Sequence, residues 1–276
     1  MENRPEQSLL GKASPYCCQY DPSLLFPIPR QQKRAELEIL SADLPFSGVD
    51  VWTAYELSWL NEQGKPEVRM GRFIFDAEAP YLIESKSFKL YLNGFNGSRF
   101  GSEADVIRHL ELDLMQASGK PVHVSLTDLI EPQTLIAHPP HAKCLDLLPL
   151  EVKHYQVKPE LLQAQPHLPE VSERLYSHLL KSNCLVTGQP DWGSVVIEYE
   201  GAPIRHDALL RYIVSFREHN EFHEQCVERI FTDLMRFCQP KKLLVYARYV
   251  RRGGVDINPY RANFSVEFDL RRWLRQ

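Results

Sequence analysis

The sequence lacks any long apolar run and any secretory leader pattern. No stretch approaches the roughly 20 apolar residues that a membrane-spanning helix needs. The N-terminal residues Met-Glu-Asn-Arg-Pro-Glu-Gln are polar and hold no apolar core of a signal peptide. We therefore expect a cytoplasmic protein that does not enter a membrane.

Strong charge and a disulfide pattern are also missing. The 276 residues carry a formal net charge of -4, which does not favour direct binding to a nucleic-acid duplex. Six cysteines are present, but no Cys-x-x-Cys pair occurs and the spacing indicates no disulfide framework. In a reducing cytoplasm, a thiol of lowered pKa stays free to act as a nucleophile.

The sequence has neither of the common phosphate-binding glycine motifs. No Gly-x-Gly-x-x-Gly follows a predicted strand, and no Gly-x-x-x-x-Gly-Lys-[Ser/Thr] occurs. A bound dinucleotide would therefore lie outside a Rossmann unit. One candidate for phosphate contacts is Tyr249-Val250-Arg251-Arg252-Gly253-Gly254, where two arginines and two glycines follow a strand pattern. The same segment is also typical of a hairpin turn with solvated arginines.

The first half of the chain has an α+β pattern. Alternating apolar and polar residues predict strands at Val49–Leu60 and Val68–Phe75, and a further strand at Val122–Leu126. Ser85–Leu92 is rich in helix formers. A clearer helix begins after Ser102, which we predict as its N-cap, and ends at Gly-Lys-Pro.

The second half repeats this pattern. Val195–Tyr199 and Leu243–Tyr249 alternate as strands, and the apolar stripe of Phe222–Phe237 predicts a helix that Asn220 caps. This helix contains Thr-Asp-Leu-Met where the earlier one contains Leu-Asp-Leu-Met. We therefore expect two copies of one α+β unit.

The repeat sets the predicted domain organisation. We expect an N-terminal arm at 1–44, a first module at 45–160 and a second module at 170–276. The arm is broken by prolines, so we expect it to be extended and to pack against another part of the chain, with the second module as the candidate. The boundary falls in the proline-rich stretch 131–170, where 145–155 is predicted to contribute another strand.

A candidate catalytic loop lies at Leu179–Ser194. Cys184 and Asp191 flank Thr-Gly-Gln-Pro, a turn-forming set that can bring a thiol and a carboxyl group together. A thiolate with an acid beside it suits addition to an electrophilic carbon followed by protonation of the attached heteroatom. The alternative is a buried structural cysteine and an aspartate in a turn.

Four segments together resemble a known enzyme family, the NADPH-dependent 7-cyano-7-deazaguanine reductases of queuosine biosynthesis. These segments are Lys181-Ser-Asn-Cys184 with Gln189-Pro-Asp-Trp-Gly-Ser194, Glu84-Ser-Lys-Ser-Phe-Lys-Leu-Tyr91, Glu221-Phe-His-Glu-Gln-Cys226, and Arg251-Arg-Gly-Gly-Val-Asp-Ile-Asn-Pro259. The likeness runs from about residue 45 to the end, and the order of the segments resembles the long, two-module form. It implies tandem tunnelling-fold modules, antiparallel sheets with helices on one face, that form a pseudo-dimer and pair again as a homodimer.

The resemblance also implies a mechanism. The Cys184 thiolate adds to the nitrile carbon to give a covalent thioimide, and Asp191 protonates the nitrogen. Two hydrides from two NADPH then complete the four-electron reduction to an aminomethyl group. His223 is a further proton donor.

Binding residues follow from the same resemblance. A carboxylate suits a guanine-type edge, which presents a ring N–H and an exocyclic amine. The implied substrate contacts are Ile83, Glu84, Ser85, Phe222, His223 and Glu224. The implied NADPH contacts are Ser85, Lys86, Arg252 and Gly253. The resemblance implies no metal.

Two other functions stay open at this point. One is a zinc-dependent hydrolase of a purine or pterin with the same fold, in which Cys184, His219 and His223 bind the metal, since the two histidines have helical ligand spacing. The other is a nucleobase-binding protein without catalysis. For Glu84 and the lysines that follow it, the plain alternative is a helix N-terminal charge with a solvated face.

Overall fold

The computed structural model describes residues 4, 7–8, 19–40, 43–129, 136–137 and 141–276. It divides into two compact units. Unit 1 comprises Met1–Glu36, Val49–Thr134 and Arg251–Asp256, and unit 2 comprises Leu37–Gly48, Leu135–Val250 and Ile257–Gln276. Within the described part of the chain, no helix is both long enough and apolar enough to cross a membrane.

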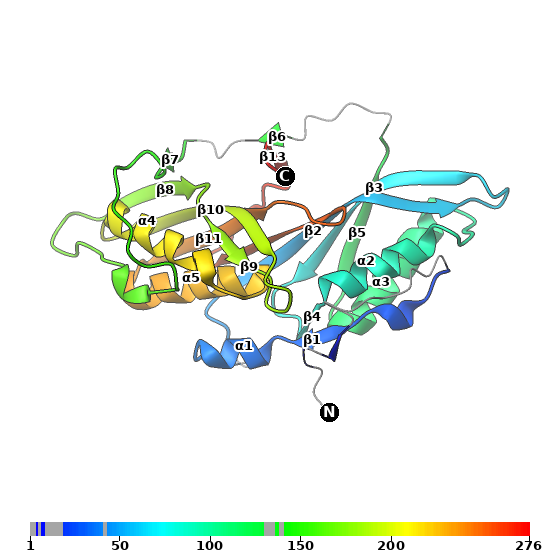
Figure 1. Cartoon of the computed structure of the whole chain (residues 1–276), viewed down its shortest axis with the longest axis horizontal. Helices are drawn as coiled ribbons and strands as arrows, with labels where there is room; N and C mark the ends of the chain where they lie inside the picture. Colours follow the sequence, from blue (N-terminus) through cyan, green and yellow to red (C-terminus); the bar gives the residue numbers. More distant parts are fainter. Residues whose placement is uncertain (1–3, 5–6, 9–18, 41–42, 130–135, 138–140) are drawn as a thin grey trace. The chain divides into compact units, whose positions relative to one another are not determined.

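Unit 1 is built on an antiparallel sheet in the order β5-β3-β2. Its strands are β2 (Ser47–Leu60), β3 (Pro66–Asp76) and β5 (Val122–Thr127), and its helices are α2 (Ser85–Phe95) and α3 (Glu103–Ser118). Figure 1 shows α2 and α3 on one face of this sheet. Phe88 of α2 packs edge-on against Trp52 of β2 and Phe73 of β3, each with ring centroids 5.0 Å apart.

The predicted elements of unit 1 are confirmed. The Ser102 hydroxyl caps α3 by accepting a hydrogen bond from the Asp105 N–H at 3.1 Å. The helix ends at Gly119, which has a left-handed φ of 87°. A β-bulge between Ala54 and Leu57 interrupts the pairing of β2 with β3, and the alternating pattern gave no sign of it.

The described part of the N-terminal arm up to Glu36 belongs to unit 1, so the expected packing on the second module is wrong for that stretch. From Leu37 onward the arm belongs to unit 2, as expected, and Leu37 and Ile39 lie in its core. The arm contains η2 (Pro22–Leu24), β1 (Pro27–Pro29) and α1 (Gln31–Glu36), and β1 pairs with β4 (Tyr81–Ile83). Tyr20 packs against Phe95 and Phe100 of the unit 1 core.

Unit 2 repeats the layered arrangement. Its sheet runs in the order β12-β11-β10-β8-β7, and β9 pairs separately with β10. Its elements are β6 (Ile136–Ala137), β7 (Lys143–Cys144), η3 (Pro159–Leu161), β8 (Val171–Ser177), β9 (Lys181–Asn183), β10 (Pro190–Gly201), α4 (His206–Val214), η4 (Ser215–Glu218), α5 (His223–Cys238), β11 (Lys242–Tyr249), β12 (Val255–Ala262) and β13 (Arg272–Trp273). The apolar stripe of α5 is fully buried: Val227, Ile230, Phe231 and Leu234.

One predicted strand of unit 2 is wrong. Residues 145–155 form no strand, and the nearest strand before them is the short β7. Leu148, Leu150 and Val152 pack against the core while the residues between them are exposed. The alternation therefore reflects a chain with one packed side and no ladder, to which Pro149 could donate no N–H.

Candidate active site

Cys184 lies at the end of β9, in the turn that joins β9 to β10. Its N–H donates to the Gln189 carbonyl at 2.8 Å, which extends the β9–β10 pairing by one residue. The Gly188 N–H donates to the Cys184 carbonyl at 3.0 Å, and Gly188 has a φ of 66°, which a side chain would disfavour. The turn residues Thr-Gly-Gln-Pro thus form the tight connection that the sequence predicts.

The hairpin register puts Cys184 and Asp191 on one face. Asp191 pairs with Ser182, and Cys184 lies opposite Gln189. Paired residues share a face, as do residues two apart on a strand, so Cys184 and Asp191 are diagonal neighbours. Such neighbours lie about 7–8 Å apart between Cα atoms, within reach of one small molecule. Both residues are buried, Cys184 to 5% and Asp191 to 4% exposure.

The linker between η4 and α5, residues 219–222, pairs with the other edge of β9. The Asn183 N–H donates to the His219 carbonyl at 2.8 Å, and the Glu221 N–H donates to the Asn183 carbonyl at 3.1 Å. The Asn183 side chain also donates to the Asn220 side chain at 3.0 Å. The sequence predicts Asn220 as the cap of α5, and this prediction is wrong. The Asn220 side chain is bonded to Asn183 of β9, and Phe222 occupies the cap position.

The linker leads into His223, the first residue of α5. His223 Nε2 lies 3.3 Å from Asp191 Oδ1. Its ring stacks on Tyr249, the last residue of β11, with centroids 3.9 Å apart and planes at 9°. Asp191 and Tyr249 thus fix the imidazole orientation. Cys184, Asp191 and His223 come from three elements, and two backbone pairings of β9 gather them.

The other predicted binding residues of unit 2 flank His223. Glu224 lies in the first turn of α5 and is 2% exposed, and Phe222 is partly buried just before the helix. An ionised carboxylate is favoured at a helix N-terminus. Sequence reasoning did not find Tyr249, because its role depends on a contact between β11 and α5.

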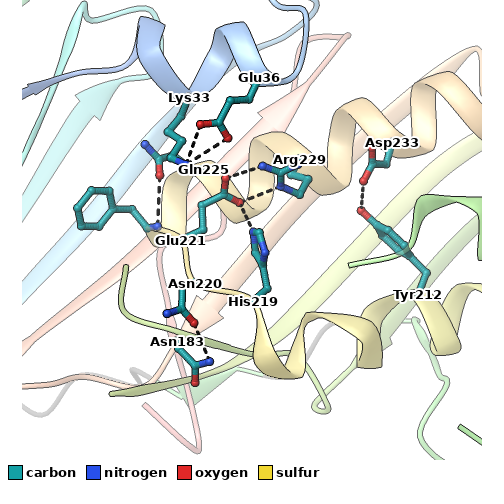
Figure 2. Close-up of polar contacts among 11 residues, drawn as sticks. Lys33, Glu36, Asn183, Tyr212, His219, Asn220, Glu221, Gln225, Arg229 and Asp233 are labelled. Carbon is teal, nitrogen blue, oxygen red and sulfur yellow. Dashed lines mark hydrogen bonds and ion pairs between the residues drawn. The ribbon is translucent and has the colours of Figure 1, made fainter. Parts of the chain in front are cut away.

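Glu221 belongs to a cluster that the sequence did not predict (Figure 2). Its carboxylate accepts two hydrogen bonds from Arg229, at 2.7 and 3.0 Å, and lies 2.8 Å from His219 Nε2. Burial alone would raise the pKa of Glu221, but the bonds from Arg229 and His219 outweigh it and lower the pKa to about 2. The carboxylate is therefore ionised at neutral pH.

In unit 1, Glu84 is the N-cap of α2. Its carboxylate accepts hydrogen bonds from the Lys86 and Ser87 N–H groups at 2.7 and 2.8 Å. Burial raises the pKa of Glu84, against the effect of those bonds and of the nearby lysines. Ile83 before it is buried and Ser85 after it is partly exposed. The predicted capping role is thus present, and the second lone pair of each oxygen leaves room for further donors.

A cavity of about 280 Å³ lies in unit 1 beside α2. Lys86, Lys89, Gly253, Gly254 and the bulge residue Glu56 are among the residues that line it. Gly253 and Gly254 have φ values of 57° and 78°, as in a type I′ turn.

Two predicted cofactor contacts, Lys86 and Gly253, therefore meet at this cavity, whereas Ser85 and Arg252 are not among its lining residues. Arg252 closes the turn through backbone bonds with Val255.

The candidate zinc ligands do not form a ligand set. His219 pairs with Glu221, and His223 with Asp191. His219 precedes α5, so the two histidines do not share a helix face. In the described residues, no group of three or more His, Cys, Asp or Glu is arranged to hold a metal ion.

Comparison with known proteins gives consistent matches. A family model described as "Nitrile reductase, 7-cyano-7-deazaguanine-reductase N-term" matches residues 16–126, and one described as "QueF-like protein" matches residues 190–266. The NADPH-dependent 7-cyano-7-deazaguanine reductase of Hydrogenovibrio crunogenus is 64% identical over 98% of this chain and 97% of its own. The protein of the same name from Cupriavidus metallidurans is 55% identical over 99% of both chains.

Proposed function

We infer the function from one premise: this chain belongs to the NADPH-dependent 7-cyano-7-deazaguanine reductase family. It reduces the nitrile of 7-cyano-7-deazaguanine with NADPH, a step of queuosine biosynthesis. The observation that carries our assignment of the active site is the gathering of Cys184, Asp191 and His223 by the pairings of β9.

In the mechanism we propose, Cys184 is the nucleophile. Its thiolate sulfur forms a bond to the nitrile carbon, and one π-bond of the nitrile breaks toward nitrogen. Asp191 supplies the proton for that nitrogen, which gives a covalent thioimide. The shared face of the β9–β10 hairpin supports this step, because the sulfur and the acid meet a substrate from one side.

NADPH, when bound, supplies one hydride to the thioimide carbon and, from a second molecule, one to the imine that follows departure of the thiolate. Each reduction consumes one proton, so the nitrile takes up two hydrides and two protons in all. His223 is placed to return protons to Asp191, since its Nε2 lies 3.3 Å from the Asp191 carboxylate.

We assign substrate recognition to Glu224 and Phe222 beside His223, and to Ile83, Glu84 and Ser85 at the start of α2. A glutamate carboxylate can accept both the ring N–H and the exocyclic amine of the deazaguanine. The geometry supports these roles, because each Glu84 oxygen keeps a lone pair beside its backbone bond and Glu224 lies next to His223 in the first turn of α5.

We assign NADPH binding to Ser85, Lys86, Arg252 and Gly253. The cavity beside α2 fits a phosphate-bearing cofactor, because Lys86 and Lys89 supply positive charge and Gly253 carries no side chain. Its lining residues also include Glu56, which leaves the cavity with mixed charge.

We also propose tunnelling-fold modules at 45–160 and 170–276, a homodimer, and a cytoplasmic location, as the family resemblance implies. The function is tested by the loss of NADPH absorbance when the nitrile is added to purified protein. We expect two NADPH oxidised per nitrile consumed. Oxidation of NADPH without the nitrile, or none with it, would contradict the assignment.

A further inference from the structure

The linker between η4 and α5 is hydrogen-bonded to β9, the strand just before the nucleophile Cys184. It leads directly into α5, which begins with His223. The linker backbone pairs with Asn183, the residue before Cys184, through His219 and Glu221, and His223 lies two residues after Glu221. Backbone pairing alone leaves such a linker free to move with its own helix. A side-chain contact between the linker and α5 adds a second restraint on the position of His223.

The Glu221 side chain provides that restraint. Its carboxylate contacts Arg229, two turns into α5, and His219 at the start of the linker (Figure 2). The side chain of Glu221 is 1% exposed and that of Arg229 is 17% exposed. Both carboxylate oxygens receive a guanidinium N–H, so the contact fixes orientation as well as distance.

A buried ion pair of this kind is weak evidence for stability, because its desolvation offsets its attraction. What it supplies is one defined geometry. The site uses that geometry directly, since His223 must keep Nε2 on Asp191 and its ring on Tyr249. The same carboxylate contacts His219, the first residue of the linker, and Arg229 of α5.

We propose that Glu221 and Arg229 are positioning residues that hold the Cys184 turn and His223 in register for thioimide formation. This inference rests on the proposed function. Neither residue needs to touch the substrate. Their loss should therefore lower the saturating rate of adduct formation more than the affinity for the nitrile.

The test follows the mass gain of protein mixed with the nitrile and no NADPH. For Glu221→Gln we expect the saturating rate to fall by about 10- to 100-fold, as a misplacement of about 1 Å can cause. The half-saturating nitrile concentration should change by less than about threefold, because uniform binding is retained. Tyr212→Phe is the matched control: it removes the buried 2.6 Å hydrogen bond from Tyr212 of α4 to Asp233 of α5, and it keeps the Glu221 carboxylate and the Arg229 guanidinium.

Two further variants keep the test decisive if Glu221→Gln does not fold. Arg229→Lys retains the charge but loses the planar fork, so we expect a smaller loss of the same rate. The double variant Glu221→Gln, Arg229→Gln leaves no unpaired buried charge and should be less impaired than the sum of the single changes. Wild-type rates in Arg229→Lys, or losses matching those of Tyr212→Phe, would overturn the proposal. Absence of any adduct in the wild type would instead overturn the proposed mechanism, on which this inference rests.

Discussion

Each unit contains an equivalent hydrogen bond between its two helices. In unit 1, the Tyr91 hydroxyl of α2 donates to Asp113 of α3 at 2.7 Å. In unit 2, the Tyr212 hydroxyl of α4 donates to Asp233 of α5 at 2.6 Å. Both aspartates belong to the repeated Asp-Leu-Met, so the repeat in the sequence marks a repeat in tertiary contacts.

The units differ in the residues placed around this shared bond. Ten residues before the shared aspartate, α5 has His223, whereas α3 has Glu103. Seven residues before the shared tyrosine, α2 is capped by Glu84, whereas the corresponding position before α4 is Arg205. One scaffold thus carries the proposed proton transfer in unit 2 and a lysine-lined cavity in unit 1. The framework residues are shared by the two units, whereas the residues assigned to chemistry differ.

The largest effect should come from removing the nucleophile of unit 2. We expect Cys184→Ala to lower the NADPH oxidation rate by at least about 10³-fold, as loss of a nucleophile does in other enzymes. Cys238→Ala is the control, because burial raises the pKa of that thiol to about 12 and makes it unreactive. Activity in Cys184→Ala close to that of Cys238→Ala would contradict the assignment of Cys184 as the nucleophile, and with it the chemical role given to unit 2.

Asp191→Asn should have the next largest effect. The amide keeps the shape of the side chain but cannot deliver a proton, so we expect the steady-state rate to fall by about 10²- to 10⁴-fold. Steady-state NADPH oxidation measures this loss. Asp146→Asn is a comparison within unit 2, since that carboxylate accepts from the Ser177 hydroxyl and has no role in the mechanism. Equal losses in both variants would contradict the assigned role.

The shared tyrosine bond predicts a smaller effect on stability. Tyr212→Phe should lower the free energy of unfolding by about 1–3 kcal/mol, because a buried acceptor loses its donor. Tyr91→Phe should cost less, since Asp113 also accepts from Tyr20 at 2.6 Å. Denaturant unfolding measures both. A larger loss of stability for Tyr91→Phe than for Tyr212→Phe would contradict this prediction, because Tyr20 would then not compensate for the missing Tyr91 hydroxyl.

The smallest effect concerns the cavity of unit 1. Gly253→Ala places a Cβ 3.3 Å from Lys89 Cδ at a φ of 57°, so we expect the KM for NADPH to rise several-fold at a backbone cost of about 1–2 kcal/mol. Gly64→Ala is the control, with a φ of 80° in the β2–β3 turn and only the end of Arg99 nearby. An equal rise in KM for both variants would argue against NADPH binding at this cavity.

The sequence predicted the framework well because local patterns determine it. Strand alternation, the Ser102 cap and the repeated Asp-Leu-Met are short-range signals, and the structure confirms them. The failures come from tertiary context. Residues 145–155 alternate without forming a strand, and the Asn220 amide accepts a hydrogen bond from the Asn183 side chain of β9 instead of capping the helix it precedes.

The site shows the same division. The turn residues between Cys184 and Asp191 predicted a hairpin, but only the structure gives its register. Nothing in the sequence indicated that His223 stacks on Tyr249, or that Arg229 clamps Glu221, because these contacts join residues from separate elements or from successive turns. The β-bulge beside Glu56 was equally hidden, since an extra residue in one strand keeps the local pattern plausible.

The central claim is tested most directly by mass spectrometry of the protein mixed with 7-cyano-7-deazaguanine in the absence of NADPH. We predict a mass gain equal to one nitrile, located on the peptide that contains Cys184, which disappears when NADPH is added. A protein that oxidises NADPH with the nitrile but never carries this mass on Cys184 would contradict the account.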